Sequence, residues 1–211
     1  MKLNGQEVNK IILGVRSSIV QTKTIDESGA RKIMDDEETG FICPKSNQVI
    51  VGRAHLGDEN GKTTYKYGEL SFLNDDYKEY EFELSDVFYS NYFSEKDSCY
   101  ACPEGALIVG REHIGDENGK TRYAYKKLYV KKKNYGTLIP CKICSEMQGE
   151  HSVKESSGEW SEYMITVERD IKDPEPEKTY YAPMYGRDHK GDENGKTTTY
   201  FACMELTTGQ S

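Results

Sequence analysis

The dominant feature of this chain is a twelve-residue motif that occurs three times. The pattern Gly-Arg-x-His-x-Gly-Asp-Glu-Asn-Gly-Lys-Thr begins at Gly52, Gly110 and Gly186. Ten of the twelve positions are identical in all three copies, and only the residues on either side of the histidine differ. Self-similarity of this kind indicates a repeat architecture, in which each unit buries its apolar side against its neighbours. We therefore expect a pseudo-threefold protein that carries one feature three times.

Each copy of the motif predicts a β-hairpin. An Asn-Gly pair between alternating residues favours a two-residue type I′ turn, because both central residues of that turn have positive φ. We expect these turns at Asn60-Gly61, Asn118-Gly119 and Asn194-Gly195. In that register one face of the first hairpin is polar and carries Arg53, His55, Glu59 and Lys62, while the other face is apolar and carries Ile50, Leu56, Tyr65 and Tyr67.

The expected fold class is all-β, a pseudo-threefold repeat of β-hairpin units with a β-prism or β-trefoil-like architecture. The composition agrees, because 16 Tyr and 19 Gly among 211 residues suit strands and turns. We expect a single triplicated domain over residues 1–211, with units at about 22–78, 79–161, and 162–211 plus 1–21. The strand near residues 11–21 would then complete the third unit. Residues 26–38 are the only fair helix candidate.

Charge and hydropathy exclude two classes of partner. The net charge of −8 argues against nucleic acid, which selects basic surfaces. No segment approaches the roughly 20 apolar residues of a membrane-spanning helix, so no membrane partner is expected. The first residues lack the apolar core of a signal peptide. We expect a soluble, cytoplasmic protein, or one secreted without a visible signal peptide.

The six cysteines include two Cys-x-x-Cys pairs. In a chain without a signal peptide such pairs favour a tetrathiolate zinc site over disulfides. The expected ligands of this structural zinc are Cys99, Cys102, Cys141 and Cys144. Three disulfides remain the alternative if the protein is exported.

Other metal and anion sites are weaker expectations. The acidic loop at Asp58 could hold Ca²⁺, but it lacks the spacing of an EF-hand loop. Convergence of the hairpins on the threefold axis would bring His55, His113 and His189 into a three-histidine metal site. The Gly61-Lys62-Thr63 sequence ends like a phosphate-binding loop, but a strand and not a helix follows it.

The motif also supplies the candidate ligand-binding residues. Turn geometry accounts for Asn-Gly, but it does not account for an arginine and a histidine in every copy. We expect three equivalent sites built from Arg53, His55, Asp58, Glu59 and Asn60; from Arg111, His113, Asp116, Glu117 and Asn118; and from Arg187, His189, Asp192, Glu193 and Asn194. The alternative is that arginine and glutamate form a buried ion pair, repeated as a structural staple.

In layout, the triplicated hairpins, short polar loops and Tyr-rich strands resemble the threefold-repeat β lectins. The resemblance implies a multivalent carbohydrate-binding protein, since linked sites raise avidity when one ligand engages several of them. No serine or cysteine nucleophile has an identifiable histidine partner, so we expect no enzyme activity. The alternative function is a cytoplasmic protein–protein interaction or inhibitor protein on a metal-stapled β scaffold.

Overall fold

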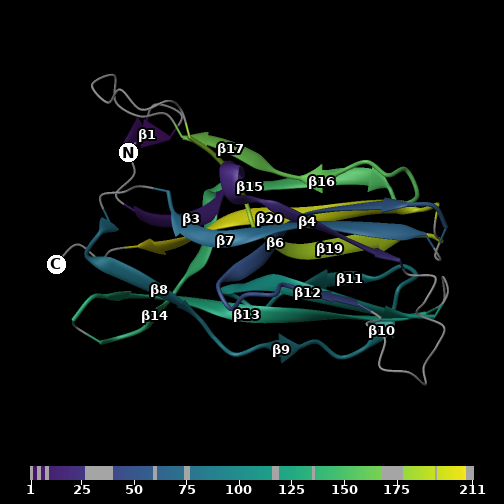
Figure 1. Cartoon of the computed structure of the whole chain (residues 1–211), viewed down its shortest axis with the longest axis horizontal. Coiled ribbons are helices and arrows are strands. Elements are labelled where there is room, and N and C mark those ends of the chain that lie inside the picture. Colours follow the sequence, from purple (N-terminus) through teal and green to yellow (C-terminus); the bar gives the residue numbers. More distant parts are fainter. Residues whose placement is uncertain are drawn as a thin grey trace.

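A computed structural model describes residues 2–3, 6–7, 10–26, 40–58, 61–73, 77–115, 119–134, 136–167, 178–192 and 194–207. Within these ranges the protein is built from β-strands and one short 3-10 helix, so the prediction of an all-β fold is confirmed (Figure 1). The elements are β1 (Lys2–Leu3), β2 (Gln6–Glu7), β3 (Lys10–Arg16), η1 (Ser17–Ile19), β4 (Gln21–Asp26), β5 (Gly40–Ile42), β6 (Gln48–Leu56), β7 (Lys62–Phe72), β8 (Tyr80–Leu84), β9 (Phe88–Tyr89), β10 (Phe93–Ser94), β11 (Cys99–Ala101), β12 (Ala106–Ile114), β13 (Lys120–Lys132), β14 (Ile139–Pro140), β15 (Lys142–Lys154), β16 (Ser161–Glu162), β17 (Met164–Val167), β18 (Lys178–Tyr181), β19 (Met184–Lys190) and β20 (Lys196–Thr207).

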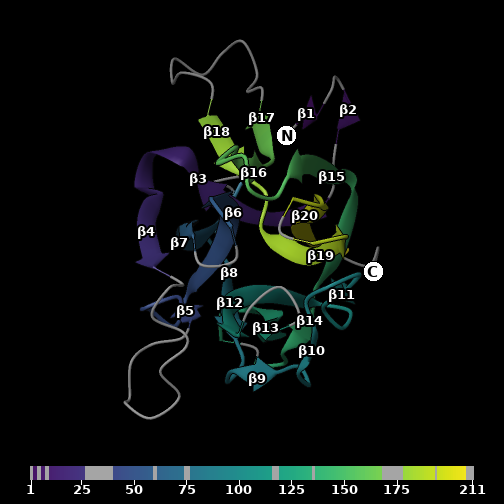
Figure 2. The ribbon, with the colours of Figure 1, turned by 90° about the vertical axis from the view of Figure 1, so that its right-hand side faces the viewer.

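The strands form two large, curled antiparallel sheets and one small one. A seven-stranded sheet is built around the hairpin β12–β13, and an eleven-stranded sheet contains the hairpins β6–β7 and β19–β20. The remaining sheet pairs β1 with β2. Seen end-on, the three hairpins surround a common centre (Figure 2). Their turns lie at the same end of the molecule, on the right in Figure 1.

The same strand pairings recur around each hairpin. The second strand of each hairpin pairs with an outer strand, in the pairs β4 with β7, β10 with β13, and β15 with β20. The first strand pairs with a short strand that comes from another part of the chain, in the pairs β16 with β6, β5 with β12, and β11 with β19. Each motif hairpin is therefore flanked on both sides.

The register of the hairpins differs from the expected one. Leu56 pairs with Lys62 and His55 pairs with Thr63, so five residues and not two separate the paired strands. The first glycine of the loop, Gly57, adopts a φ of 104°, and the Gly61 N–H donates to the Asp58 carbonyl oxygen at 2.7 Å. The predicted type I′ turns are wrong, because Gly61, Gly119 and Gly195 are not among the described residues with positive φ, which this turn requires at its second central residue.

Strand β3, near the N-terminus, and the last strand, β20, lie side by side. Leu13 of β3 pairs with Met204 of β20, and β3 also pairs with β7 and β18. The apolar residues of β3 are fully buried and join the hairpin strands in two core clusters. The helix candidate at residues 26–38 lies outside the described residues apart from Asp26, which ends β4. Among the described residues no helix is long and apolar enough to cross a membrane.

Candidate functional site

The arginine and histidine of every motif copy point into the protein. Their exposed fractions lie between 2% for Arg187 and 5% for Arg53, His55 and Arg111. Arg53 pairs across the hairpin with the buried Tyr65, so both side chains share the inner face of the sheet. The expected division into an open polar face and a buried apolar face is therefore wrong. The shift in register moves Tyr65 and Thr63 onto the face that carries the arginine and the histidine.

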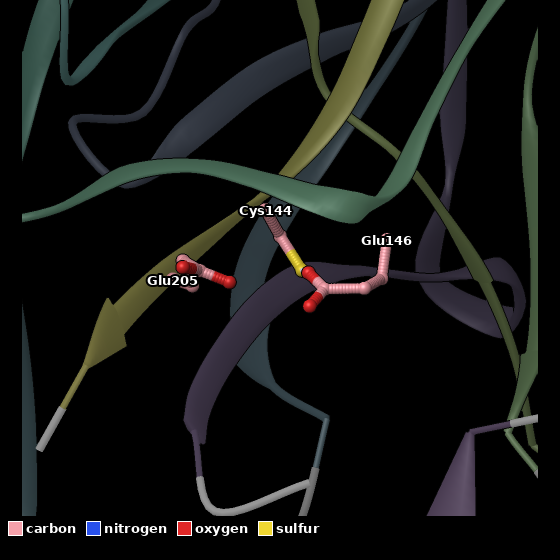
Figure 3. Close-up of side chains that lie close together, drawn as sticks. All are labelled: Cys144, Glu146 and Glu205. Atoms are coloured by element: carbon pink, nitrogen blue, oxygen red, sulfur yellow. The ribbon is translucent and has the colours of Figure 1, made fainter. Parts of the chain in front are cut away.

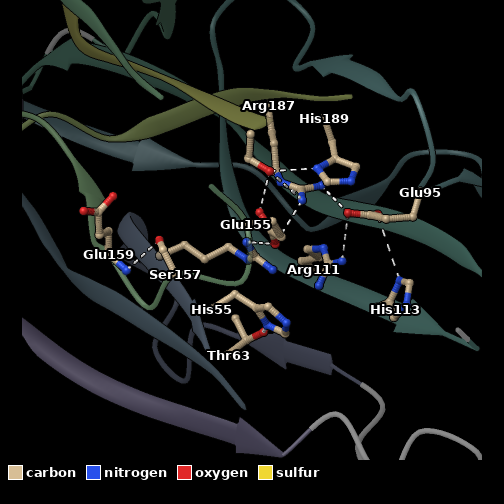
Figure 4. Close-up of polar contacts among 12 residues, drawn as sticks. His55, Thr63, Glu95, Arg111, His113, Glu155, Ser157, Glu159, Arg187 and His189 are labelled. Carbon is tan, nitrogen blue, oxygen red and sulfur yellow. Dashed lines mark hydrogen bonds and ion pairs between the residues drawn. The ribbon is translucent and has the colours of Figure 1, made fainter. Parts of the chain in front are cut away.

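The three arginines converge on two buried carboxylates (Figure 4). Arg187 lies between them: its Nη1 contacts Glu95, and its Nη2 lies 3.2 Å from Glu155 Oε1. Arg53 Nη1 contacts Glu155, and Arg111 Nη2 lies 3.2 Å from Glu95 Oε1. These five side chains are called the buried ion network below. Each carboxylate joins arginines from two different hairpins, so the network ties the repeats together.

The two glutamates occupy equivalent places in the fold. Glu95 follows β10, and its N–H donates to the Gly119 carbonyl oxygen at 3.0 Å. Glu155 follows β15, and its N–H donates to the Gly195 carbonyl oxygen at 2.9 Å. Each glutamate is the first residue after its strand, and that strand, β10 or β15, flanks the second strand of a hairpin, β13 or β20. Beside the first hairpin that flanking strand is β4, which ends at Asp26. The next residue in the sequence is a glutamate, Glu27, which lies outside the described residues.

In the first and third copies the motif histidine bonds to the motif threonine across the hairpin, whereas in the second copy His113 Nδ1 lies 4.0 Å from Glu95 Oε2. His55 Nε2 donates to the Asp58 carbonyl oxygen at 2.8 Å, and its Nδ1 lies 2.8 Å from Thr63 Oγ1. A carbonyl can only accept, so this ring carries its proton on Nε2. In the third copy the Thr197 hydroxyl donates to Glu155, so Nδ1 of His189 is the donor in its 2.8 Å contact with Thr197.

Electrostatics keep the network ionised. Burial disfavours the charged form of Glu95, but Arg187 and Arg111 outweigh it and hold the pKa of that carboxyl well below its usual range. Burial likewise opposes ionisation of Glu155, and Arg53 and Arg187 hold its pKa low. Burial lowers the pKa of His189, and the charge of Arg187 lowers it further. Ion pairs therefore form the centre of the protein, with a neutral histidine beside them.

The rest of the motif falls between the paired strands, in the segments 57–61, 115–119 and 191–195, which are called the hairpin loops. Gly57, Gly115 and Gly191 all have φ near 100°, at 104°, 102° and 96°, which explains a glycine at this position in every copy. Asp58 and Asp192 are exposed, as are Lys62, Lys120 and Lys196 after the loops. Six of the predicted ligand-binding residues lie outside the described residues: Glu59, Asn60, Asp116, Glu117, Asn118 and Glu193.

The predicted site residues therefore divide into two groups. The arginines and histidines meet at the protein centre, as the structural-staple alternative requires, and the exposed aspartates stay at the loops. Sequence reasoning missed Glu95 and Glu155, because both lie outside the motif. The available signal was the charge balance, since three arginines on a buried face require carboxylates. Among the described residues the three histidines do not form a metal-binding group.

The four cysteines of the predicted zinc site are not brought together. Cys99 is exposed on β11, whereas Cys141 and Cys144 are buried at β15. Burial raises the pKa of both buried thiols to about 12. Within the described residues only Cys144, Glu146 and Glu205 form a possible metal group (Figure 3). Two lysines already pair with its carboxylates: the Lys10 ammonium lies 2.8 Å from Glu146 and 3.0 Å from Glu205, and the Lys142 ammonium lies 3.8 Å from Glu205.

The fold and the site together define an all-β protein whose repeated hairpins are joined by a buried ion network. Comparisons with protein-family models, with curated proteins and with solved structures find no match for this chain.

Proposed function

We propose that this protein is a non-enzymatic, multivalent glycan-binding protein whose three hairpin loops contact the ligand. The proposal includes a pseudo-threefold arrangement of the hairpin units, of the prism or trefoil kind. The strand pairings that recur around each hairpin support this arrangement.

One observation carries the proposal: the part of the motif that has no role in the interior is also identical in every copy. Burial and hydrogen bonds explain the arginine, histidine and threonine, and positive φ explains the first loop glycine. Neither explains the motif lysine, which is exposed in all three copies as Lys62, Lys120 and Lys196. The lysine follows the loop in every copy, and the three hairpins end on the same side of the fold, an arrangement that suits a repeated ligand (Figure 1).

The loop chemistry favours sugars. Carboxylate, amide and ammonium groups supply the donors and acceptors that sugar hydroxyls require. The buried ion network lies directly beneath the loops, because Glu95 and Glu155 hydrogen-bond to Gly119 and Gly195 of two of them. A rigid base of this kind fixes the loops before the ligand arrives, and this lowers the entropic cost of binding.

Aspartate-to-alanine variants of the loops test the proposal. D58A removes one loop carboxylate, and the triple variant D58A/D116A/D192A removes all three. Linked sites raise avidity by roughly 10² or more, so D58A should weaken retention on a glycan surface by about tenfold or more. The triple variant should abolish retention while the protein stays folded.

K131A is the matched control, since Lys131 lies on β13 and pairs with Glu81 at 3.3 Å, away from the hairpin loops. K131A should bind as the wild type does. Undiminished retention of the triple variant on every glycan that the wild type binds would contradict the proposal.

A further inference from the structure

A small groove lies on the outer face of the second hairpin, and its Glu112–Arg122 pair stands two residue pairs before the hairpin loop. Its volume is about 190 Å³, and its lining includes Phe41 and Ile42 of β5, Tyr89 of β9, and Glu112, Arg122 and Ala124 of the hairpin. Ile42 and Tyr89 are 46% and 53% exposed. The groove therefore combines apolar walls with the Arg122–Glu112 pair, and its lining also includes Arg111 of the buried ion network.

Arg122 is held rigidly in this groove. Its guanidinium carbon lies 4.6 Å from the ring centroids of both Tyr89 and Tyr92. Its Nε donates to Glu112, and the Tyr92 hydroxyl donates to the same carboxylate at 2.8 Å. The terminal nitrogens of Arg122 take no hydrogen-bond acceptor from the described residues. A guanidinium fixed in this way loses little entropy when it binds a carboxylate through those nitrogens.

The other two hairpins lack this arrangement. The register places Thr64 of the first hairpin and Thr198 of the third at the position of Arg122. Both threonines bond to a hydroxyl of the flanking strand, Thr24 at 2.9 Å and Ser152 at 2.7 Å. The structural role at this position is therefore met by a threonine. An arginine clamped between two tyrosines in one copy alone is not required by the fold.

We propose that this groove is a second binding site, which takes one carboxylate-bearing sugar ring, such as a uronic acid. Arg122 binds the carboxylate through its terminal nitrogens, while Tyr89 and Ile42 contact the apolar side of the ring. The volume is sufficient for one sugar ring. The assignment of the ligand to a sugar depends on the proposed glycan-binding function, whereas the assignment of a carboxylate-binding site does not. The site itself is separate from the loops.

The test is an NMR titration of the full chain with methyl glucuronide and with methyl glucoside, which lacks the carboxylate. The glucuronide should shift the backbone amides of Ile42 and Ala124, and it should bind at least about tenfold more tightly than the glucoside, the range of a charged hydrogen-bonded pair. R122Q should remove that difference, and R122K should retain part of it. K131Q removes the same charge from the same strand and should bind normally.

Y89A tests the ring contact if R122Q does not fold, and it should weaken binding of both sugars. Equal affinity of the wild type for the two sugars, or equal binding by R122Q, would overturn the proposal. Binding of N-acetylglutamate as tight as that of the glucuronide would overturn the assignment to a sugar. The triple variant D58A/D116A/D192A should keep this site, so failure of loop binding and failure of the groove are distinguishable.

Discussion

Replacement of Arg187 by methionine should destabilise the protein more than any exposed charge substitution. Arg187 is 2% exposed and lies between Glu95 and Glu155. R187M leaves two buried carboxylates with fewer cations. Removing one partner from a buried pair costs about 3–5 kcal/mol. The loss should not double, because Glu155 keeps Arg53 and Glu95 keeps Arg111.

The loss is measurable by urea unfolding, followed through the fluorescence of the single tryptophan, Trp160. A loss of about 3–5 kcal/mol corresponds to a fall in Tm of roughly 6–20 °C for a chain of this size. K131Q, which breaks a partly exposed pair, should cost less than about 1 kcal/mol. If R187M also costs less than about 1 kcal/mol at an unchanged denaturant slope, Arg187 does not hold two buried carboxylates and the reasoning fails.

Three further predictions follow from the same geometry. The free energy of unfolding should be greatest above pH 6.5, because the pKa values of His189, Glu95 and Glu155 are lowered in the folded protein and the unfolded chain therefore binds more protons in acid. It should fall below pH 6.5 and most steeply below pH 4.5, by about 1.4 kcal/mol per pH unit for each carboxyl. A Tm that is constant from pH 7 to pH 4 would contradict this prediction. E27Q should lower the free energy of unfolding about as much as E95Q, because Glu27 follows Asp26, which pairs with Lys62, just as Glu95 follows Ser94, which pairs with Lys120. Urea unfolding of E27Q that matches the wild type would show that Glu27 is not the equivalent acid. G57A should cost about 1–2 kcal/mol in thermal unfolding, since alanine is strained at a φ of 104°, and an unchanged Tm would mean that the loop adopts another conformation.

The sequence predicts the hairpins well because hairpin formation is local. Alternating residues around Asn-Gly are enough to place β6–β7, β12–β13 and β19–β20. The register is not local, since it depends on which glycine of the loop takes positive φ. Gly57 and Gly61 are both candidates in the sequence, and only the three-dimensional structure distinguishes them. Because the observed loop is longer than the predicted two-residue turn, the residues that share a face with Arg53 differ from those predicted.

The site is harder to predict than the hairpins because its carboxylates come from distant segments. Glu95 and Glu155 lie outside the motif, in stretches that do not resemble each other. Their common role depends on the flanking strands β10 and β15, which pair with β13 and β20. The groove at Arg122 is also invisible in the sequence, since Tyr89 and Ile42 reach it from two other strands.

Chemical modification of arginine tests most directly the claim that the repeated arginines form a buried network. The folded protein is treated with phenylglyoxal, and each arginine is quantified by mass spectrometry against the protein unfolded in urea. Arg53, Arg111 and Arg187 should be protected, whereas Arg122, whose side chain is 31% exposed, should react. Modification of the three motif arginines at the rate of the unfolded chain would contradict the account.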